Sequence, residues 1–243
     1  MTDNPDISVV VPAHNEAGNV TGLAAEIAEA LDGRHYEMIF VDDCSTDGTQ
    51  AELVAAKTRF PALRVLAHSH NAGQSRSLRT GILAARGRII GTMDGDGQNP
   101  PADLPALIDA LSRKDAPERL AVVGGRRTQR QDSAWKKFAS RLGNGIRKAL
   151  LRDDADDTGC GLKAFYRSAY LDLPYFDHQH RFLYALFKRE GYLAEFRDVG
   201  HRPRGAGKSK YTNFGRLFAS LSDMLGVMWL NSRARNAGGA DEL

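Results

Sequence analysis

The sequence predicts an α/β protein with a mostly parallel sheet and helices on both faces. Short apolar runs rich in β-branched residues alternate with longer segments in which apolar residues recur every three or four positions. Five such strands are separated by helical segments, which is typical of parallel strands joined by crossover helices. The 243 residues, 42% of them hydrophobic, are enough for one large domain with a buried core.

The elements follow one another regularly. Residues 7–11 form an apolar strand, and residues 16–31 carry apolar side chains at helical spacing. The pattern repeats with strands at 38–41, 63–67, 88–93 and 120–123 and helices at 48–60, 74–86 and 101–113. The last of these helices begins with Pro101, and proline is favoured in the first turn of a helix.

The C-terminal part of the chain predicts an amphipathic helix. Its apolar residues stand at helical spacing: Phe214, Leu217, Phe218, Leu221, Met224, Leu225 and Met228. The helix either packs this face on the domain or lies in a membrane interface. We therefore expect one domain over residues 1–211 and a helix with a tail over residues 212–243. No apolar run is long enough to cross a bilayer, and no secretory signal precedes the first strand.

Charge is unevenly distributed along the chain although the net charge is only +3. Residues 126–152 hold nine Lys or Arg and one acid, and residues 202–216 hold five and none. These segments indicate an anionic ligand, or else ordinary solvated surface. Nucleic acid is less favoured because aromatic residues are not interleaved with the cations. The two cysteines form no zinc or disulfide pattern, which fits a reducing cytoplasm.

Polar motifs follow three of the predicted strands, where ligands bind in parallel sheets. They read PAHNE (12–16), DDCSTDG (42–48) and DGDGQN (94–99). In the third, Asp94 and Asp96 share one face of extended chain, and Gly95 leaves room for a bulky anion to approach. Two carboxylates in an open turn suit Mg²⁺ or Mn²⁺ that keeps positions for substrate phosphates. The alternative is a solvated turn, but acids converging from several strands favour a cation.

Other readings of these motifs fit less well. An EF-hand would need Gly and Glu where Asn99 and Pro105 stand, and a dinucleotide site would need glycines after the first strand. A P-loop at 205–209 would need glycine at Arg202. We expect Asp47 or Ser45 to cap the following helix, and His14 to be local scaffolding rather than a metal ligand.

Together these motifs resemble the family-2 glycosyltransferases of the GT-A fold, and within them the polyprenyl-phosphate (dolichyl-phosphate) glycosyltransferases. The resemblance covers residues 7–230. It rests on VVPAHNE (10–16), VDDCSTDGT (41–49), NAGQ (71–74) and MDGDGQNPP (93–101). Two later segments, DTGCGLKAF (157–165) and HRPR with GKSKY (201–211), resemble the acceptor-side motif and basic segment of bacterial lipid-phosphate glycosyltransferases.

The resemblance implies a function. The protein would transfer a sugar, with inversion, from a UDP- or GDP-linked donor to a polyprenyl (undecaprenyl or dolichyl) phosphate, using Mg²⁺ or Mn²⁺. Many relatives continue into two transmembrane helices, which this chain does not show, so we expect peripheral attachment at the cytoplasmic face of the membrane and no nucleic-acid partner.

The resemblance also implies roles for individual residues. The metal would be held by Asp94, Asp96 and Gln98. The nucleotide sugar would be bordered by Pro12, Asn15, Glu16, Asp42, Asp43 and Asp94. The acceptor phosphate would be bound by Arg126, Lys137, Arg204, Ser209 and Lys210. The residues expected to act in the reaction itself are Asp96, Asp157, Arg126 and Arg204.

Three alternatives stay open. Asp157 either orients basic side chains or acts as a base, the latter if the acceptor is a hydroxyl. Lys137 could be replaced by Arg141 as the partner of Arg126. At the level of function, the alternatives are a related transferase acting on a saccharide hydroxyl and a non-catalytic sugar-nucleotide-binding or membrane-adaptor protein, which would show no turnover.

Overall fold

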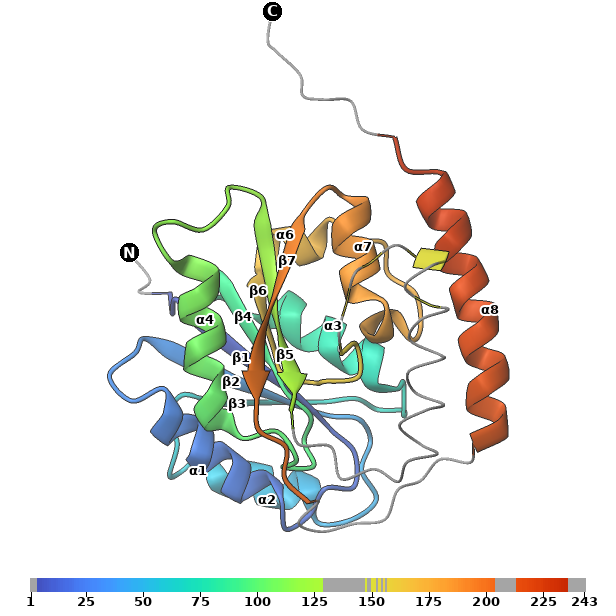
Figure 1. The fold of residues 1–243 in the computed structure, drawn as a ribbon. Coiled ribbons are helices and arrows are strands. Elements are labelled where there is room, and N and C mark those ends of the chain that lie inside the picture. Colours follow the sequence, from blue (N-terminus) through green and yellow to red (C-terminus); the bar gives the residue numbers. More distant parts are fainter. Residues whose placement is uncertain are drawn as a thin grey trace, which may run out of the picture.

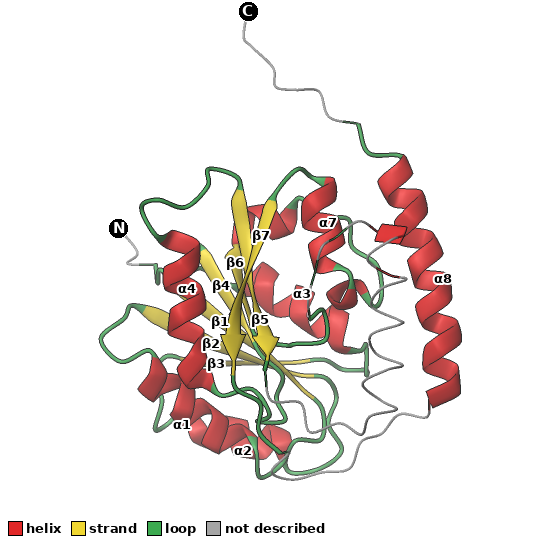
Figure 2. Cartoon of the chain, viewed as in Figure 1, coloured by secondary structure: helices red, strands yellow, loops and turns green. Residues whose placement is uncertain are grey.

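The computed structural model describes residues 4–128, 147, 150, 151, 153, 155, 157–203 and 213–235, with the backbone alone for 213–220. In this part of the chain seven strands form one sheet with helices on both faces (Figures 1 and 2). The predicted α/β class is confirmed.

The first half of the chain alternates strands and helices as predicted. Its elements are β1 (Ile7–Ala13), α1 (Val20–Ala30), β2 (Tyr36–Asp42), α2 (Thr49–Ala56), β3 (Leu63–Ala67), α3 (Gln74–Ala84), β4 (Ile89–Thr92), the 3₁₀ turn η1 (Pro101–Asp103), α4 (Leu104–Ser112) and β5 (Leu120–Arg127). The helix expected from residue 101 thus begins as a 3₁₀ turn, with Pro101 at its first position.

The sheet contains two strands that the sequence did not predict, β6 (Lys163–Tyr166) and β7 (Leu193–Val199). The strand order is β3-β2-β1-β4-β6-β5-β7. Strands β3, β2, β1 and β4 pair in parallel, whereas β6 lies antiparallel between β4 and β5. Strands β4 and β5 therefore run in the same direction with β6 inserted between them, and the sheet is mostly parallel, as predicted.

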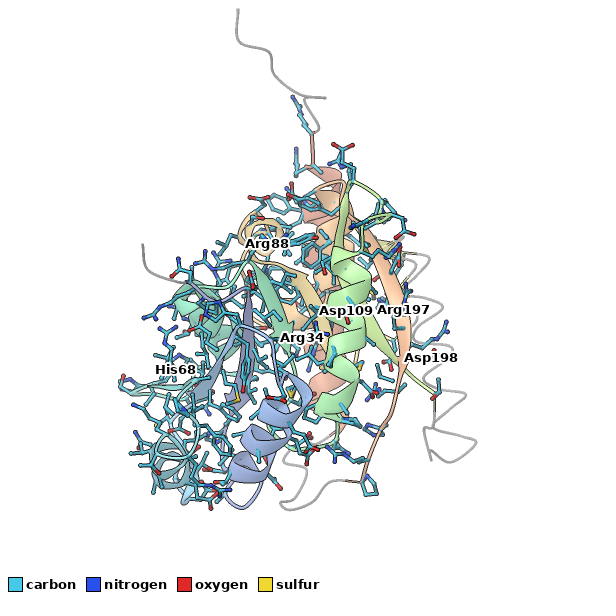
Figure 3. The ribbon with its side chains drawn as sticks, turned by 90° about the vertical axis from the view of Figure 1, so that its left-hand side faces the viewer. Arg34, His68, Arg88, Asp109, Arg197 and Asp198 are labelled. Atoms are coloured by element: carbon cyan, nitrogen blue, oxygen red, sulfur yellow. The ribbon has the colours of Figure 1, made fainter. Side chains whose placement is uncertain are left out.

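Two apolar cores lie on opposite faces of this sheet. Successive strand residues alternate between them, so that Val9 and Val11 face the first core and Val10 faces the second. Helices α1, α2 and α4 cover the first face, and α3, α6 (Arg167–Leu171) and α7 (Leu183–Arg189) cover the second. An ion pair of 2.7 Å between Arg34 and Asp109 joins the end of α1 to α4 (Figure 3).

The C-terminal helix α8 (Asn213–Ser232) lies beside α7 on the second face (Figure 1). Val227 is fully buried there, and Met224 and Met228 pack against the same core. His178 binds Asp223 of the helix at 2.8 Å. The expected boundary between residues 211 and 212 lies outside the described residues. Among those described, no helix has the length and hydropathy needed to cross a bilayer.

Candidate active site

The three predicted ligand-binding motifs meet at one edge of the sheet. Strands β2, β1 and β4 are parallel neighbours, so their carboxyl ends point the same way. Ala13 at the end of β1 is in register with Asp42 at the end of β2. Asp94 and Asp96 follow the end of β4. This edge is the candidate active site.

The turns after β1 and β2 are locked together by hydrogen bonds. Four consecutive backbone amides in the first turn each donate to a side chain from the second, within 3.3 Å: Asn15 to Ser45, Glu16 to Thr49, Ala17 to Asp47 and Gly18 to Glu52. Two residues of the DDCSTDG motif and two residues at the start of α2 therefore hold the loop that follows β1, in addition to any role toward a ligand.

The N-cap position of α2 is Gly48, so neither Asp47 nor Ser45 is the cap residue itself, and Asp47 stands one position before it. The Asp47 carboxylate accepts the backbone amide of Thr49, the first residue of α2, at 2.9 Å. Ser45 instead hydrogen-bonds Asp42. Asn15 and Cys44 hold the left-handed conformation, with φ of 55° and 57°. Such backbone is sparse for these residue types and is held here by the bonds between the two turns.

Asp42 and Asp43, expected to border the nucleotide, are both buried and already hydrogen-bonded within the protein. The carboxylate of Asp43 accepts the amides of Ala72 and Gly73, each at 2.8 Å, and lies 2.8 Å from His68. Burial alone would raise its pKa, but these bonds outweigh burial and lower it. Asp43 therefore positions the loop that leads into α3.

His14 is scaffolding, as expected. Its Nδ1 lies 2.8 Å from the carbonyl oxygen of Asp43, and the side chain of Asn71 reaches the same carbonyl oxygen at 3.2 Å.

The two carboxylates after β4 form the expected candidate metal site. Burial, together with the charge of Asp96, raises the pKa of Asp94 to about 6. A divalent cation would offset this repulsion, and carboxylate oxygens are the ligands that Mg²⁺ and Mn²⁺ prefer. In the described ranges no third His, Cys, Asp or Glu joins them. The donor set thus fits an ion that shares its coordination sphere with a ligand, rather than one enclosed by protein.

The surroundings of this pair differ in part from expectation. Gln74, the first residue of α3, donates its side-chain amide to Asp94 at 2.7 Å. The amide of Gln98 donates to Asp96 at 3.1 Å, and the Gln98 side chain reaches the carbonyl of Arg202. Gly95 does not keep space for an anion on its Cβ side, because a Cβ there would lie 2.8 Å from the carbonyl oxygen of Pro12. Its small size allows β1 and the turn after β4 to touch.

The two arginines at the end of β5 have different partners. Arg126, which the resemblance assigns to phosphate, pairs with Asp198 of β7 at 2.7 Å, and both side chains are about half exposed. Arg127 is mostly buried and binds both oxygens of Asp157, at 2.7 and 2.8 Å. This geometry fits the alternative in which Asp157 orients a basic side chain.

A buried lysine lies beside these groups and was not predicted as functional. Lys163 of β6 is only 5% exposed, donates to the carbonyl of Cys160 and lies over the ring of Tyr184. Burial lowers its pKa, while the charges of Asp94 and Asp157 act in the opposite direction. Lys163 and Arg127 both lower the pKa of Asp94, so both add positive charge near the metal motif.

The C-terminal basic segment starts beside the metal motif. The amide of Arg202 donates to the carbonyl of Gln98 at 2.9 Å, and the amide of Gly200 donates to Asp103 at 2.8 Å. The side chain of Arg202 pairs with Glu26 of α1. The remaining predicted acceptor residues lie outside the described residues: Lys137, Arg141, Arg204, Ser209 and Lys210.

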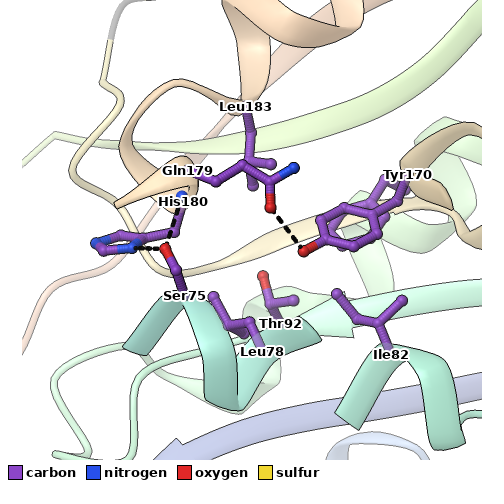
Figure 4. Close-up of a pocket in the computed structure, with 9 residues that line it drawn as sticks. Ser75, Leu78, Ile82, Thr92, Tyr170, Gln179, His180 and Leu183 are labelled. Atoms are coloured by element: carbon purple, nitrogen blue, oxygen red, sulfur yellow. Dashed lines mark hydrogen bonds between the residues drawn. The ribbon is translucent and has the colours of Figure 1, made fainter. Parts of the chain in front are cut away.

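A small pocket lies behind the strand edge, between α3, β4 and η2 (Gln179–Arg181). Ser75 binds His180 at 2.7 Å, and Tyr170 donates to Gln179 at 3.0 Å (Figure 4). The pocket is lined largely by apolar side chains of the second core and contains none of the predicted site residues. We interpret it as a packing gap.

Known proteins with similar sequences act on polyprenyl phosphates according to their names. The chain is 34% identical to a dodecaprenyl-phosphate galacturonate synthase of Rhizobium johnstonii over 92% of the chain and 67% of that protein. It is 33% identical to an undecaprenyl-phosphate 4-deoxy-4-formamido-L-arabinose transferase of Shewanella sediminis over 91% of the chain and 66% of that protein. The chain thus spans about two thirds of the length of these relatives.

Solved structures show the same fold at lower identity. Glucosyl-3-phosphoglycerate synthase of Mycobacterium tuberculosis, in complex with Mn²⁺, UDP and glucosyl-3-phosphoglycerate, has a TM-score of 0.71 at 19% identity, covering 96% of this chain and 82% of that one. Residues 8–173 match the sequence profile described as Glycosyl transferase family 2. With this match and the curated relatives at about one third identity, the chain belongs to glycosyl transferase family 2, and its sheet is the GT-A fold.

Proposed function

We propose that the protein transfers a sugar from a nucleoside diphosphate sugar to a polyprenyl phosphate, with inversion and with Mg²⁺ or Mn²⁺. The observation that carries this proposal is the hydrogen bond between the amide of Arg202 and the carbonyl of Gln98. It places the start of the basic segment at the metal motif. The names of the two curated relatives support the same acceptor class.

The acceptor chemistry explains the excess of cations. A phosphate monoester has a second pKa near 6, so at pH 7 it is already an anionic nucleophile and needs no strong base. It must instead be held against a negatively charged donor. Arg127 of β5 and Lys163 of β6 supply positive charge beside Asp94. Asp157, held by Arg127, then orients a cation, and Arg126, Lys137, Arg204, Ser209 and Lys210 are proposed to bind the phosphate.

The donor side has separate requirements. Asp94, Asp96 and Gln98 would hold the divalent ion, which when bound neutralises the departing diphosphate. The locked turns after β1 and β2 would border the nucleotide through Pro12, Asn15, Glu16, Asp42 and Asp43. Because these turns are cross-bonded at four amides, the nucleotide would meet a preformed surface.

The test is a transfer assay with Mn²⁺ and a panel of UDP and GDP sugars. Polyprenyl phosphate should accept sugar with inversion, the dephosphorylated polyprenol should not, and Arg204→Ala should lower transfer greatly. Transfer to the free alcohol, or to a soluble saccharide in preference to the lipid phosphate, would contradict the proposal. No turnover with any acceptor would favour the binding or adaptor alternative.

We also propose that the protein attaches peripherally to the cytoplasmic face of the membrane through the outer side of α8. Leu221, Leu225 and Trp229 stand one turn apart and are 49%, 61% and 59% exposed. Arg233 lies over the Trp229 ring at 5.8 Å. A tryptophan beside arginine at the end of an apolar stripe suits the headgroup region of an anionic bilayer. The side chains of Phe214, Leu217 and Phe218 lie outside those described.

Vesicle binding tests this attachment. Leu225→Glu with Trp229→Glu should reduce co-sedimentation with phosphatidylglycerol vesicles and leave the melting temperature nearly unchanged. Val54→Glu is a matched control, because Val54 is an equally exposed apolar residue of α2. Met224→Glu should instead destabilise the fold, since that side packs on the core. Unchanged vesicle binding by the double variant would contradict the attachment.

A further inference from the structure

Asp94 is held on two sides by residues that are not among the expected metal ligands. On one side the side-chain amide of Gln74 donates to its Oδ1 at 2.7 Å. On the other side Gly161, just before β6, leaves so little space that a Cβ there would lie 2.4 Å from Oδ2 and 2.5 Å from Cγ. The carboxylate therefore sits in a slot between the start of α3 and the start of β6.

Both walls of this slot are themselves fixed. Gln74 follows Gly73, whose amide is bound by Asp43 at 2.8 Å, and Asp43 lies against His68. Gly161 is held by the hydroxyl of Thr92, which donates to the Gly161 carbonyl at 2.9 Å. Thr92 also pairs with Lys163 across β4 and β6. The slot thus belongs to the rigid frame of the sheet edge.

We infer that Gln74 and Gly161 are positioning residues that hold the Asp94 carboxylate in the orientation required to bind the divalent cation. The inference rests on the proposed function, because it presumes that Asp94 is a metal ligand. Groups that orient metal-binding carboxylates commonly change metal affinity by about 10- to 100-fold when they are altered. Gln74 would act through one hydrogen bond, whereas Gly161 would act by leaving space.

The arrangement also explains a property of each residue. Gln74 is exposed, so its hydrogen bond to Asp94 contributes little to the free energy of unfolding. Its effect is instead to orient the Asp94 carboxylate. The three atoms nearest to a Cβ at Gly161 all belong to the Asp94 carboxylate. A methyl group there would therefore displace the carboxylate before it disturbs the rest of the core.

Titration of Mn²⁺ alone, followed by electron paramagnetic resonance, tests the inference directly. Gln74→Met keeps an unbranched side chain of similar length without the amide, and we expect it to weaken Mn²⁺ binding about 10-fold. Gly161→Ala should weaken binding by about 10- to 100-fold. Melting temperatures should stay close to that of the wild type, which separates positioning from a structural role.

Matched controls are available in the same chain. Gln50→Met changes an exposed glutamine in the first turn of α2, and Gly226→Ala adds a methyl group in α8 where a Cβ meets nothing within 4 Å. Both should bind Mn²⁺ like the wild type.

The outcomes separate this inference from the proposed function. One outcome overturns the positioning role and leaves the metal site standing. In that outcome the wild type binds Mn²⁺ and Asp94→Ala abolishes binding, but Gln74→Met and Gly161→Ala bind Mn²⁺ as tightly as the wild type. If the wild type binds no Mn²⁺, or if Asp94→Ala binds it normally, the metal site of the proposed function and the positioning role are both overturned.

Discussion

The two sides of the candidate site stabilise their buried carboxylates in different ways. On the side of β2 and β1, Asp43 is bound by two backbone amides and a histidine. On the side of β5 and β6, Asp157 is bound by Arg127, and the fully buried Asp153 by Arg147. Backbone amides and a histidine build a fixed hydrogen-bonding surface, whereas arginines and Lys163 concentrate positive charge.

This difference matches the two substrates proposed for the protein. A nucleotide is recognised by directional hydrogen bonds, which need a rigid frame. An anionic acceptor is held by charge, which needs cations kept in place in a partly dry environment. The metal motif after β4 lies between the two sides, because β4 pairs with β1 on one side and β6 on the other.

The largest effect is expected where the two sides meet. Asp96→Asn should lower transfer about 1,000-fold or more, equivalent to about 4 kcal/mol of transition-state stabilisation, because a neutral amide is a poor ligand for a hard divalent ion. Transfer with Mn²⁺ and the melting temperature would be measured together. Asp109→Asn, which touches only the surface pair with Arg34, should leave transfer intact. Near-normal turnover of Asp96→Asn would remove the metal role.

Loss of a buried arginine should reveal the charged side. Arg127→Met removes both guanidinium bonds to the buried Asp157 carboxylate, and we expect the free energy of unfolding to fall by about 3–5 kcal/mol. Arg126→Met is the matched control at the next position. Its pair with Asp198 is half exposed, and such pairs contribute only about 0–1 kcal/mol. Urea unfolding of both variants measures the contrast, and equal losses would refute it.

A buried carboxylate at the opposite end of β2, away from the candidate site, should be less sensitive to losing its charge. Glu37 of β2 accepts bonds from Ser8 and from the Arg86 amide, each at 2.7 Å, and from Arg64. Glu37→Gln should lower the free energy of unfolding by about 1–3 kcal/mol, because Arg64 is 30% exposed and can be hydrated. Chemical denaturation would compare it with the exposed Glu29→Gln, for which a change within about 0.5 kcal/mol is expected.

The pH dependence provides a second measurement on Glu37. Burial alone would raise the pKa of Glu37, but its hydrogen bonds outweigh burial and lower it. Its stabilising contribution is therefore present above the unfolded pKa and is lost as the pH falls through the folded one. The difference between wild type and Glu37→Gln should shrink below about pH 4.5. A constant difference down to pH 3 would contradict this account.

The same division explains what could be predicted from the sequence. Strands β1, β2 and β4 are apolar runs buried on both faces, and the motifs that follow them are contiguous in the chain. Local patterns therefore predicted their positions and the meeting of the motifs that follow them at one edge of the sheet. In contrast, β6 has four residues, and β7 is an edge strand with charged and partly exposed residues. Neither shows a clear period, and antiparallel insertion depends on contacts far apart in the sequence.

Individual residues of the site were likewise predictable only where their contacts are local in the sequence. Lys163 stands in a predicted motif, but a lysine gives no sign in sequence that it will be buried. Gln74 was within the NAGQ motif, yet its partner Asp94 lies 20 positions later and is reached only through the fold. Arg126 and Arg127 are neighbours whose partners, Asp198 and Asp157, are assigned only when β7 and the start of β6 are in place.

The smallest expected effect concerns His180, which lies on the second face beneath the candidate site. Its Nδ1 is 2.7 Å from the hydroxyl of Ser75, and the His180 amide donates to the same hydroxyl at 3.2 Å (Figure 4). Burial, reinforced by the charges of Arg181 and Lys163, lowers the pKa of His180 to about 3. An unfolded histidine has a pKa of about 6.5. Between these values the unfolded chain binds a proton that the folded protein does not, so stability falls as the pH falls.

The variant His180→Asn should remove this dependence. Below about pH 6.5 the wild type should lose stability relative to the variant by at most about 1.4 kcal/mol per pH unit. The raised pKa of Asp94 acts in the opposite direction between about pH 4 and 6, so the difference between the two proteins, rather than either profile alone, isolates His180.

Ser75→Ala controls for the lost hydrogen bond, because it should lower stability at every pH while keeping the wild-type slope. Urea unfolding at pH 7.5, 6.5, 5.5 and 4.5, values spaced to bracket the unfolded pKa of about 6.5, measures the slopes. Parallel profiles for wild type and His180→Asn would mean that His180 takes up its proton in the folded protein as readily as in the unfolded chain.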